Sequence, residues 1–393
     1  MKRPAADRAE FAELVATRRD LHAHPELAFQ ERRTSGLVAE RLRALGYTVK
    51  TGVGRTGVVG VLRGGATVAR PERKLLLRAD MDALPIQETG EVVYRSTVPG
   101  VMHACGHDGH VAIALGVAKL LADARAEWRG TVKLVFQPAE ETGNGAQAMI
   151  NDGALDSPAV DAAFGLHLIS HLPVGTVAAT AGPIMGSVDN FTVRLRGKGG
   201  HAAMPHTAVD PVLAAAHVVT ALQSLVSRTA DPFDQLVVSV TRITSGTTSN
   251  VIPEEAELEG TVRTMGGPQY AEMPDRLGAL VKGVAGALGC TATVAYARTT
   301  PPVVNDEAMT ALVARVAGEI VGADHVLTRE RMLGGEDFAL YLQRLPGCFA
   351  WVGCGNAEKG VDAPHHSSRF DIDEEAMVIG VELLERVVRE YLV

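Results

Sequence analysis

Several side chains that can bind a metal or act as a nucleophile crowd into one short stretch, VMHACGHDGH (residues 101–110). They are His103, Cys105, His107, Asp108 and His110. Thiolate and imidazole are good ligands for Zn²⁺ and neighbouring first-row metals. Cys105 and His107 can share a face only in a turn, which a glycine before a helix provides, and a helix N-terminus lowers the pKa of a thiol. Taken alone, the pair is also compatible with a structural role or with a cysteine nucleophile and its histidine base.

Carboxylates and further histidines follow apolar runs elsewhere in the chain. Glu140 and Glu141 stand side by side in PAEETGNG, His167 ends DAAFGLHL, and His365 and His366 lie in PHHSSRF. Neighbouring side chains tend to point apart. We therefore expect one glutamate to hold a metal while the other takes a proton from water. Each feature alone has a simpler explanation, a solvated turn or a core histidine, but together they favour a metal cluster.

The elements that must position these residues alternate between strands and helices. Apolar runs at 74–85, 131–149 and 161–168 end at the candidate residues, and helical segments at 109–126 and 145–153 lie between them. This order predicts a largely parallel or mixed sheet flanked by helices, with the functional groups beyond the carboxyl ends of its strands.

A second unit interrupts this pattern. From residue 189 the order strand, helix, strand, strand, helix, strand matches a ferredoxin-like arrangement. We therefore predict an α/β protein with a catalytic domain at 1–185 and 299–393. A smaller inserted domain is expected at 186–298.

Composition narrows the class of protein. The chain has 393 residues, a net charge of −8 and a pI near 5.9, which argue against nucleic acid or an anionic membrane as partner. Its sequence has neither a continuous apolar leader nor an 18-residue apolar window. Four cysteines are too few for a disulfide framework, so we expect a cytoplasmic protein.

The ordered motifs resemble one family of metallopeptidases. LHAHPELAFQE, RADMDALP, MHACGHDGH, FQPAEE, GLH, GKGGHAAMPH, TSNVIPEEAELEGTVRT, GGEDFALY and HHSSRFDIDEEA occur in the order found in the aminoacylase, hippurate hydrolase and indole-acetyl-amino-acid hydrolase family. The resemblance spans about residues 10–392 and implies a two-domain, two-metal peptidase fold with an inserted lid. The implied metal ligands are Cys105 as a bridge, His107, Glu141, His167 and His366.

The resemblance also implies roles around the metals. Glu140 is the general base, and His366 is chosen over its neighbour because the family places the ligand directly before Ser. Asp80 stands where the wider family often has a metal-binding His and is a weaker candidate, whereas Asp82 orients an imidazole. Asp108 either orients an imidazole or caps a helix.

In the inserted domain, His201 of GKGGHAAMPH is expected to reach the other subunit's site and stabilise the oxyanion. A phosphate loop is disfavoured there because the Lys-Ser/Thr pair is missing. Asn250 and Arg263 are candidate ligands of a substrate carboxylate, although Arg263 could equally form a surface ion pair. Gly335 belongs to a Gly-rich loop near the substrate, or to a plain turn.

We therefore expect a metal-dependent amidohydrolase that cleaves N-acyl amino acids of the hippurate, N-acetyl or aryl-acyl type. Two divalent ions are expected, zinc first, with manganese, cobalt or nickel as alternatives. The partners are a small-molecule substrate and a second copy of the chain, as a homodimer or a dimer-based tetramer. The alternatives are a dipeptidase or carboxypeptidase of the same family, a cysteine-nucleophile hydrolase and a non-catalytic binding protein.

Overall fold

The computed structural model describes residues 8–66 and 72–392, and the chain divides into two compact units. The first comprises residues 1–182, 304–330 and 337–393, and the second comprises 183–303 and 331–336. The second unit is thus built from an insertion and a short later segment, which lies outside the insertion expected from the sequence.

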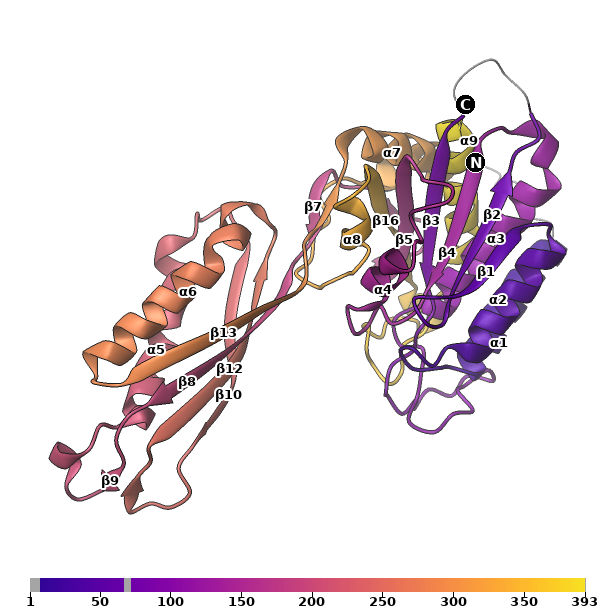
Figure 1. Ribbon diagram of the computed structural model, residues 1–393. Helices are drawn as coiled ribbons and strands as arrows, with labels where there is room; N and C mark the ends of the chain where they lie inside the picture. Colours follow the sequence, from indigo (N-terminus) through magenta and orange to yellow (C-terminus); the bar gives the residue numbers. More distant parts are fainter. Residues whose placement is uncertain (1–7, 67–71, 393) are drawn as a thin grey trace. The chain divides into compact units, whose positions relative to one another are not determined.

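The first unit is built on an eight-stranded mixed sheet (Figure 1). Its strands, in the order in which they pair, are β1 (Thr48–Val53), β2 (Gly57–Arg63), β4 (Thr131–Gln137), β3 (Lys74–Asp80), β5 (Ala162–Pro173), β16 (Gly347–Gly355), β6 (Val177–Ala178) and β15 (Val326–Leu327). The central pairs β4–β3, β3–β5 and β5–β16 are parallel. Their carboxyl ends therefore meet at one edge, where ligands gather in such sheets.

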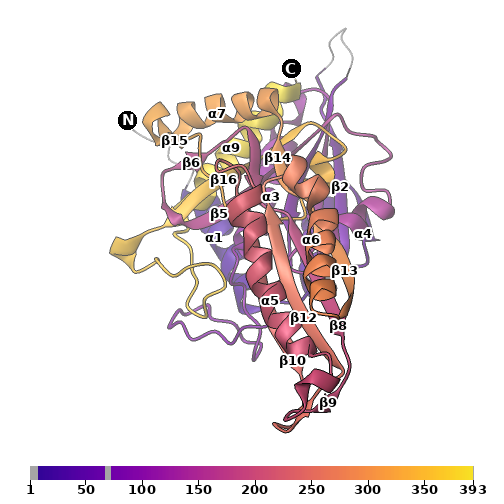
Figure 2. The same cartoon turned by 90° about the vertical axis from the view of Figure 1, so that its left-hand side faces the viewer.

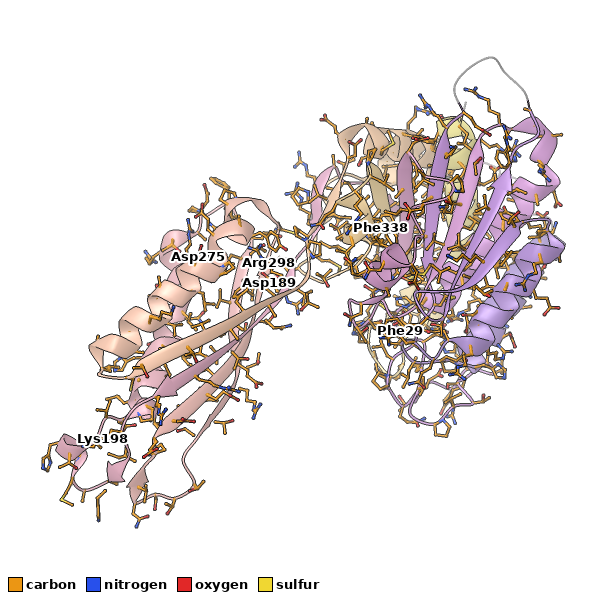
Figure 3. All side chains as sticks on the ribbon, viewed as in Figure 1. Phe29, Asp189, Lys198, Asp275, Arg298 and Phe338 are labelled. Carbon is orange, nitrogen blue, oxygen red and sulfur yellow. The ribbon has the colours of Figure 1, made fainter. Side chains whose placement is uncertain are left out.

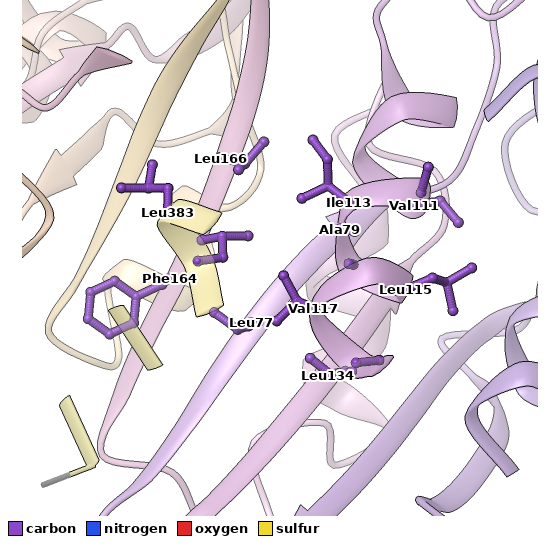
Figure 4. Close-up of a cluster of buried hydrophobic side chains, with 14 of the residues drawn as sticks. Leu77, Ala79, Val111, Ile113, Leu115, Val117, Leu134, Phe164, Leu166 and Leu383 are labelled. Carbon is purple, nitrogen blue, oxygen red and sulfur yellow. The ribbon is translucent and has the colours of Figure 1, made fainter. Parts of the chain in front are cut away.

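Helices cover this sheet. They are α1 (Arg8–Ala23), α2 (Arg32–Ala44), α3 (His107–Asp123), α4 (Gly145–Asn151), α7 (Glu307–Val321), α8 (Ala339–Leu342) and α9 (Glu375–Leu392). Helix α3 packs against α1, α9 and strand β3, so nearly all of its turns are buried. Leu77 and Leu134 of the sheet, Val117 of α3 and Leu383 of α9 belong to one continuous core (Figure 4). This packing fixes the N-terminus of α3 near the strand ends.

The second unit has the predicted ferredoxin-like topology. Its elements are β8 (Val188–Arg196), α5 (Pro211–Ser224), β10 (Leu236–Ser245), β12 (Glu255–Thr264), α6 (Gly267–Ala287) and β13 (Thr291–Thr300). The strands pair in the order β10-β12-β8-β13, antiparallel throughout. Helices α5 and α6 lie side by side over the sheet (Figure 2). Alternate residues of β8 and β12 are buried because one face of the sheet packs on these helices.

Short strands complete the description: β7 (Gly182–Met185), β9 (Gly200–His201), β11 (Val251–Ile252) and β14 (Val303–Asn305). Strands β9 and β11 pair with each other at the β12 end that starts with Glu255. Among the described residues, every helix is too short or too polar to cross a membrane.

Candidate metal centre

The candidate ligands meet around the Cys105 thiol, beyond the carboxyl ends of β3 and β4 and beside the middle of β5, which carries His167. Gly106 has φ of 89°, a left-handed conformation that suits glycine, and it turns the chain from Cys105 into α3. The Cys105 Sγ lies 3.5 Å from His167 Nε2. Two sets of possible ligands share this thiol, with the ligand atoms of each set within 4.8 Å of one another. The sets are Cys105, His107 and His167, and Cys105, Glu141 and His366.

Hydrogen bonds orient two of these imidazoles. Nδ1 of His107 lies 2.8 Å from the carbonyl oxygen of Asp82, and Nδ1 of His167 lies 2.8 Å from that of Leu168. A carbonyl only accepts, so Nδ1 carries the proton and Nε2 keeps its lone pair. Among the described residues, His107 Nε2 and Glu141 Oε1 are buried with no hydrogen-bond partner. Unsatisfied atoms of this kind beside a thiol fit a divalent cation.

Asp82 fixes the backbone of the two glutamates. Its carboxylate accepts the backbone N–H groups of Glu140 and Glu141 at 3.0 and 3.1 Å. Both glutamates reach within 4.8 Å of a ligand atom of His107, so the expectation that they point apart is wrong. The alternation rule holds within strands, whereas this dipeptide lies in a turn that follows Ala139, whose φ is +54°.

Asp80 and His110 form hydrogen bonds with each other and with neighbouring groups. Asp80 lies 2.5 Å from Arg78 Nη1 and 2.6 Å from His110 Nδ1. His110 Nε2 accepts the backbone N–H of Leu168 at 2.9 Å, so both of its nitrogens are used. Burial opposes the charge on Asp80, but Arg78 and the nearby histidines prevail and lower the pKa of its carboxyl well below the usual range. These two side chains therefore form a buried polar support beneath the candidate ligands.

The two adjacent C-terminal histidines differ in their contacts. His365 Nε2 accepts the backbone N–H of Ser170 at 3.1 Å, and burial lowers the pKa of His365 to about 3. His366 Nε2 instead lies 3.4 Å from Glu141 Oε1, and this contact raises the pKa of His366. His366 is thus the one that faces Cys105 and Glu141.

The pKa of the Cys105 thiol differs from what the sequence led us to expect. Burial and the Glu141 carboxylate raise the pKa of the Cys105 thiol well above its usual value in the metal-free chain. The expectation that the helix N-terminus lowers this pKa is wrong for this state, because desolvation of a thiolate outweighs a helix dipole. A cation at the site would supply the missing positive charge.

His201 and Asn250 lie together in the second unit. Val251 pairs with His201 across β9 and β11, and Ala202 donates its backbone N–H to the Asn250 carbonyl at 3.1 Å. A cavity of about 480 Å³ borders both residues. His201 is exposed, and its Nδ1 accepts the backbone N–H of Ala203 at 3.0 Å.

Arg263 and Gly335 lie at the other end of β12. A side-chain carbon at Gly335 would come within 3.8 Å of Arg263 Nη1 and 2.2 Å of Val188 Cγ2, so a larger residue there would require Val188 to move. Arg263 is half-buried and lies near Asp189. Asp189 also lies near Arg298 (Figure 3), and it accepts a 2.7 Å hydrogen bond from the Tyr296 hydroxyl. From Glu255 to Arg263 the strand rises roughly 27 Å, so one unit does not bring Asn250 and Arg263 together.

Comparison with known proteins identifies the family. Residues 76–390 match Peptidase family M20/M25/M40. The chain belongs to this family. It is 41% identical over 371 residues to thermostable carboxypeptidase 2 of Saccharolobus solfataricus, covering 93% of this chain and 92% of the relative. It is also 41% identical to N-acetylcysteine deacetylase of Bacillus subtilis, covering 95% of each.

Solved structures agree with the fold. A Bacillus subtilis protein described as a dinuclear metal binding peptidase from the M20 family is 35% identical, with a TM-score of 0.85 over 98% of this chain and 99% of that one. The predicted two-part α/β fold with an inserted ferredoxin-like unit is confirmed. The M20 chain is accordingly a hydrolase, a metallo-amidohydrolase or metallopeptidase.

Sequence reasoning assigned no role to two supporting residues of this M20 hydrolase, although His22 lies in the motif LHAHPELAFQE. Arg18 and His22 lie on α1 and contact Asp108, about ninety positions later. Asp108 makes no side-chain cap on α3, so the capping alternative is wrong. The remaining cysteines, Cys290, Cys348 and Cys354, are buried, as expected for small apolar side chains.

Proposed function

We propose that this M20 hydrolase cleaves the amide bond of N-acyl amino acids. The observation that carries the proposal is the pair of three-residue sets that share Cys105, with Glu140 beside them. We propose that Cys105, His107, Glu141, His167 and His366 hold two divalent ions. One thiolate, three imidazoles and a carboxylate suit zinc, and manganese, cobalt or nickel are alternatives. When bound, such ions polarise a carbonyl and lower the pKa of water.

Glu140 is the proposed general base. Its backbone is held by Asp82 through a 3.0 Å hydrogen bond, so the carboxylate starts from a fixed position beside His107. It takes a proton from the attacking water and returns it to the leaving nitrogen as the amide bond breaks. Asp82 acts through the backbone of both glutamates and through the imidazole of His107.

The rest of the proposed site requires a second copy of the chain. Because His201 and Arg263 lie at opposite ends of one unit, a single substrate would need His201 from a partner to use both. The outer strand β10 exposes Val237 and Ile243, and α5 exposes Val212 and Leu213, which supports a homodimer. In this proposal the partner's His201 stabilises the oxyanion and the partner's Asn250 binds the substrate, together with Arg263 and the Gly335 loop of the first chain.

The substrate class rests on chemistry and on relatives. The half-buried guanidinium of Arg263 suits a carboxylate such as that of an amino acid product. The deacetylase relative supports an N-acyl amino acid, and the carboxypeptidase relative supports peptide cleavage as a second candidate. We also propose a cytoplasmic location, since the four cysteines are unpaired.

The test is a hydrolysis panel on chelator-stripped protein, restored separately with Zn²⁺, Mn²⁺ and Co²⁺. The panel compares hippurate, N-acetyl amino acids and simple dipeptides. We expect metal-restored cleavage of the N-acyl substrates. Cleavage of dipeptides alone would favour the peptidase, activity that ignores metal would indicate Cys105 as a nucleophile, and no cleavage of any substrate in the panel would leave the substrate unidentified.

A further inference from the structure

A buried arginine stands behind the candidate metal centre. Arg18 of α1 is fully buried, and its guanidinium contacts three carboxylates. Nε donates to Asp108 at 2.8 Å, Nη2 donates to Asp371 at 2.7 Å, and Nη1 lies 3.5 Å from Glu374. The guanidinium also lies 4.8 Å from the centre of the Tyr94 ring. Three other segments of the chain therefore converge on one side chain.

Two of these segments carry candidate ligands. Asp108 directly follows His107 at the start of α3, and Asp371 follows His366 by five positions. The planar fork of an arginine can bind two carboxylates at fixed angles, which a lysine ammonium does not do. Arg18 thus links the helix start that bears Cys105 and His107 to the segment that bears His366.

The segment that bears His366 is held in place by hydrogen bonds to other parts of the chain. Residues 362–374 form neither helix nor strand in the described structure. His366 has φ of +63°, an unfavourable conformation for a residue with a side chain, and its backbone N–H donates to the Ala104 carbonyl at 2.8 Å. Asp371 is held by Arg18 and by the Tyr94 hydroxyl at 2.7 Å.

A second cationic group, the imidazole of His22, also contacts Asp108. His22 Nδ1 lies 2.8 Å from Asp108 Oδ2, and His22 Nε2 lies 3.3 Å from Glu88, which accepts the backbone N–H of Ser96 at 2.7 Å. Asp108 is completely buried, so its charge requires these cationic partners. The polar contacts explain why an arginine is accommodated on the buried face of α1, which also carries Thr17 and His22.

We propose that Arg18 is a positioning residue of the metal centre, which sets the distance between His366 and Cys105 by binding Asp371 and Asp108 together. The proposal rests on the metal ligands proposed above. It predicts that loosening this link weakens one metal site more than the other. The site made of Cys105, Glu141 and His366 depends on the Asp371 segment, whereas Cys105, His107 and His167 lie outside it.

Three variants test this link. Arg18→Lys keeps a charge but loses the fork, and Asp371→Ala removes the link while keeping the contact between Arg18 and Asp108. Arg19→Lys is the matched control, because Arg19 is the next residue and binds Glu374 at 2.7 and 2.8 Å while 41% of its side chain is exposed. Asp371 is 18% exposed, so its replacement by alanine decides the question if the Arg18 variant fails to fold.

The measurement is titration of the metal-free chain with Co²⁺, followed by the thiolate charge-transfer and d–d absorption bands. Competition with a chelator for Zn²⁺ gives the affinities. We expect Asp371→Ala and Arg18→Lys to weaken one of two bound ions by about 10- to 100-fold, and Asp371→Ala to leave the other ion unchanged. Arg19→Lys should stay within about twofold of the unchanged chain for both ions, because it keeps the charge beside Glu374 and leaves the contacts of Arg18 with Asp108 and Asp371 in place.

Two results would overturn the proposal in different ways. If the unchanged chain binds two ions and folded Asp371→Ala binds both with the same affinities, the positioning role alone fails. If the unchanged chain does not bind two ions with a thiolate band, the ligand set of the proposed function fails together with this inference.

Discussion

Glu140 and Glu141 carry the same side chain at adjacent positions, and we propose different roles for them. Glu141 lies 3.4 Å from His366 Nε2 and 4.0 Å from His107 Nε2, inside the candidate ligand set. We expect Glu140→Gln to keep the metal content and to lower kcat by about 10²- to 10⁴-fold, because only the proton acceptor is lost. Metal analysis and steady-state kinetics check this, with Glu141→Gln as the comparison that should lose metal. Full activity of metal-loaded Glu140→Gln would refute the base assignment.

At the same scale, sequence reasoning finds the residues that follow strands and misses those that act through contacts distant in sequence. Cys105, His107 and His167 were predicted because each lies in a motif, and the structure groups them. Arg18 has no motif that points to a metal centre, since its partners Asp108 and Asp371 are 90 and 353 positions away. The orientation of Glu140 and Glu141 was missed because it depends on a turn rather than on strand alternation.

At the scale of elements, strand β4 is fastened to the loop that follows α4 by one buried lysine. Lys133 Nζ donates to the carbonyls of Ala154, Asp156 and Pro158 at 2.9, 2.5 and 2.7 Å, while its side chain is almost completely buried. We expect Lys133→Met to destabilise the protein by about 2–4 kcal/mol, because three carbonyls lose a charged donor. Chemical denaturation measures the change. Lys50→Met is the control: Lys50 makes a 3.2 Å contact to Asp152 at the surface, and a loss similar to that of Lys133→Met would contradict the argument.

Elements with a strong periodic pattern were predicted close to their observed bounds. The helical segment expected at 145–153 is α4 (Gly145–Asn151), and the one expected at 109–126 is α3 (His107–Asp123). Helix α3 begins two residues before its expected start because Gly106 in the left-handed conformation already turns the chain. Helix α2 (Arg32–Ala44) was missed. Its mean hydropathy is low, and its buried residues are only Thr34, Val38, Ala39 and Leu42. The charged residues between them make the apolar pattern hard to recognise in the sequence.

At the scale of the whole molecule, the proposed dimer makes each active site a product of two chains. Two inactive variants should then complement each other. A chain with Glu140→Gln still offers His201, and a chain with His201→Ala still offers Glu140. A mixed dimer therefore contains one site with both groups. Random pairing after co-expression makes half of the dimers mixed, so we expect about one quarter of the wild-type rate, whereas each variant alone has very little activity.

The control for this complementation is a chain that cannot pair. Ile243 lies on the outer strand β10 and is 56% exposed, so Ile243→Lys places a charge where a second copy would dock. Adding Ile243→Lys to both variants should yield monomers by light scattering and abolish the recovered activity. Recovery in monomers, or none in mixed dimers of confirmed composition, would mean that His201 does not act across the dimer. Because the two ends of β12 lie roughly 27 Å apart, one chain could not then bring both Arg263 and His201 to the same substrate, and one of these two proposed roles would be wrong.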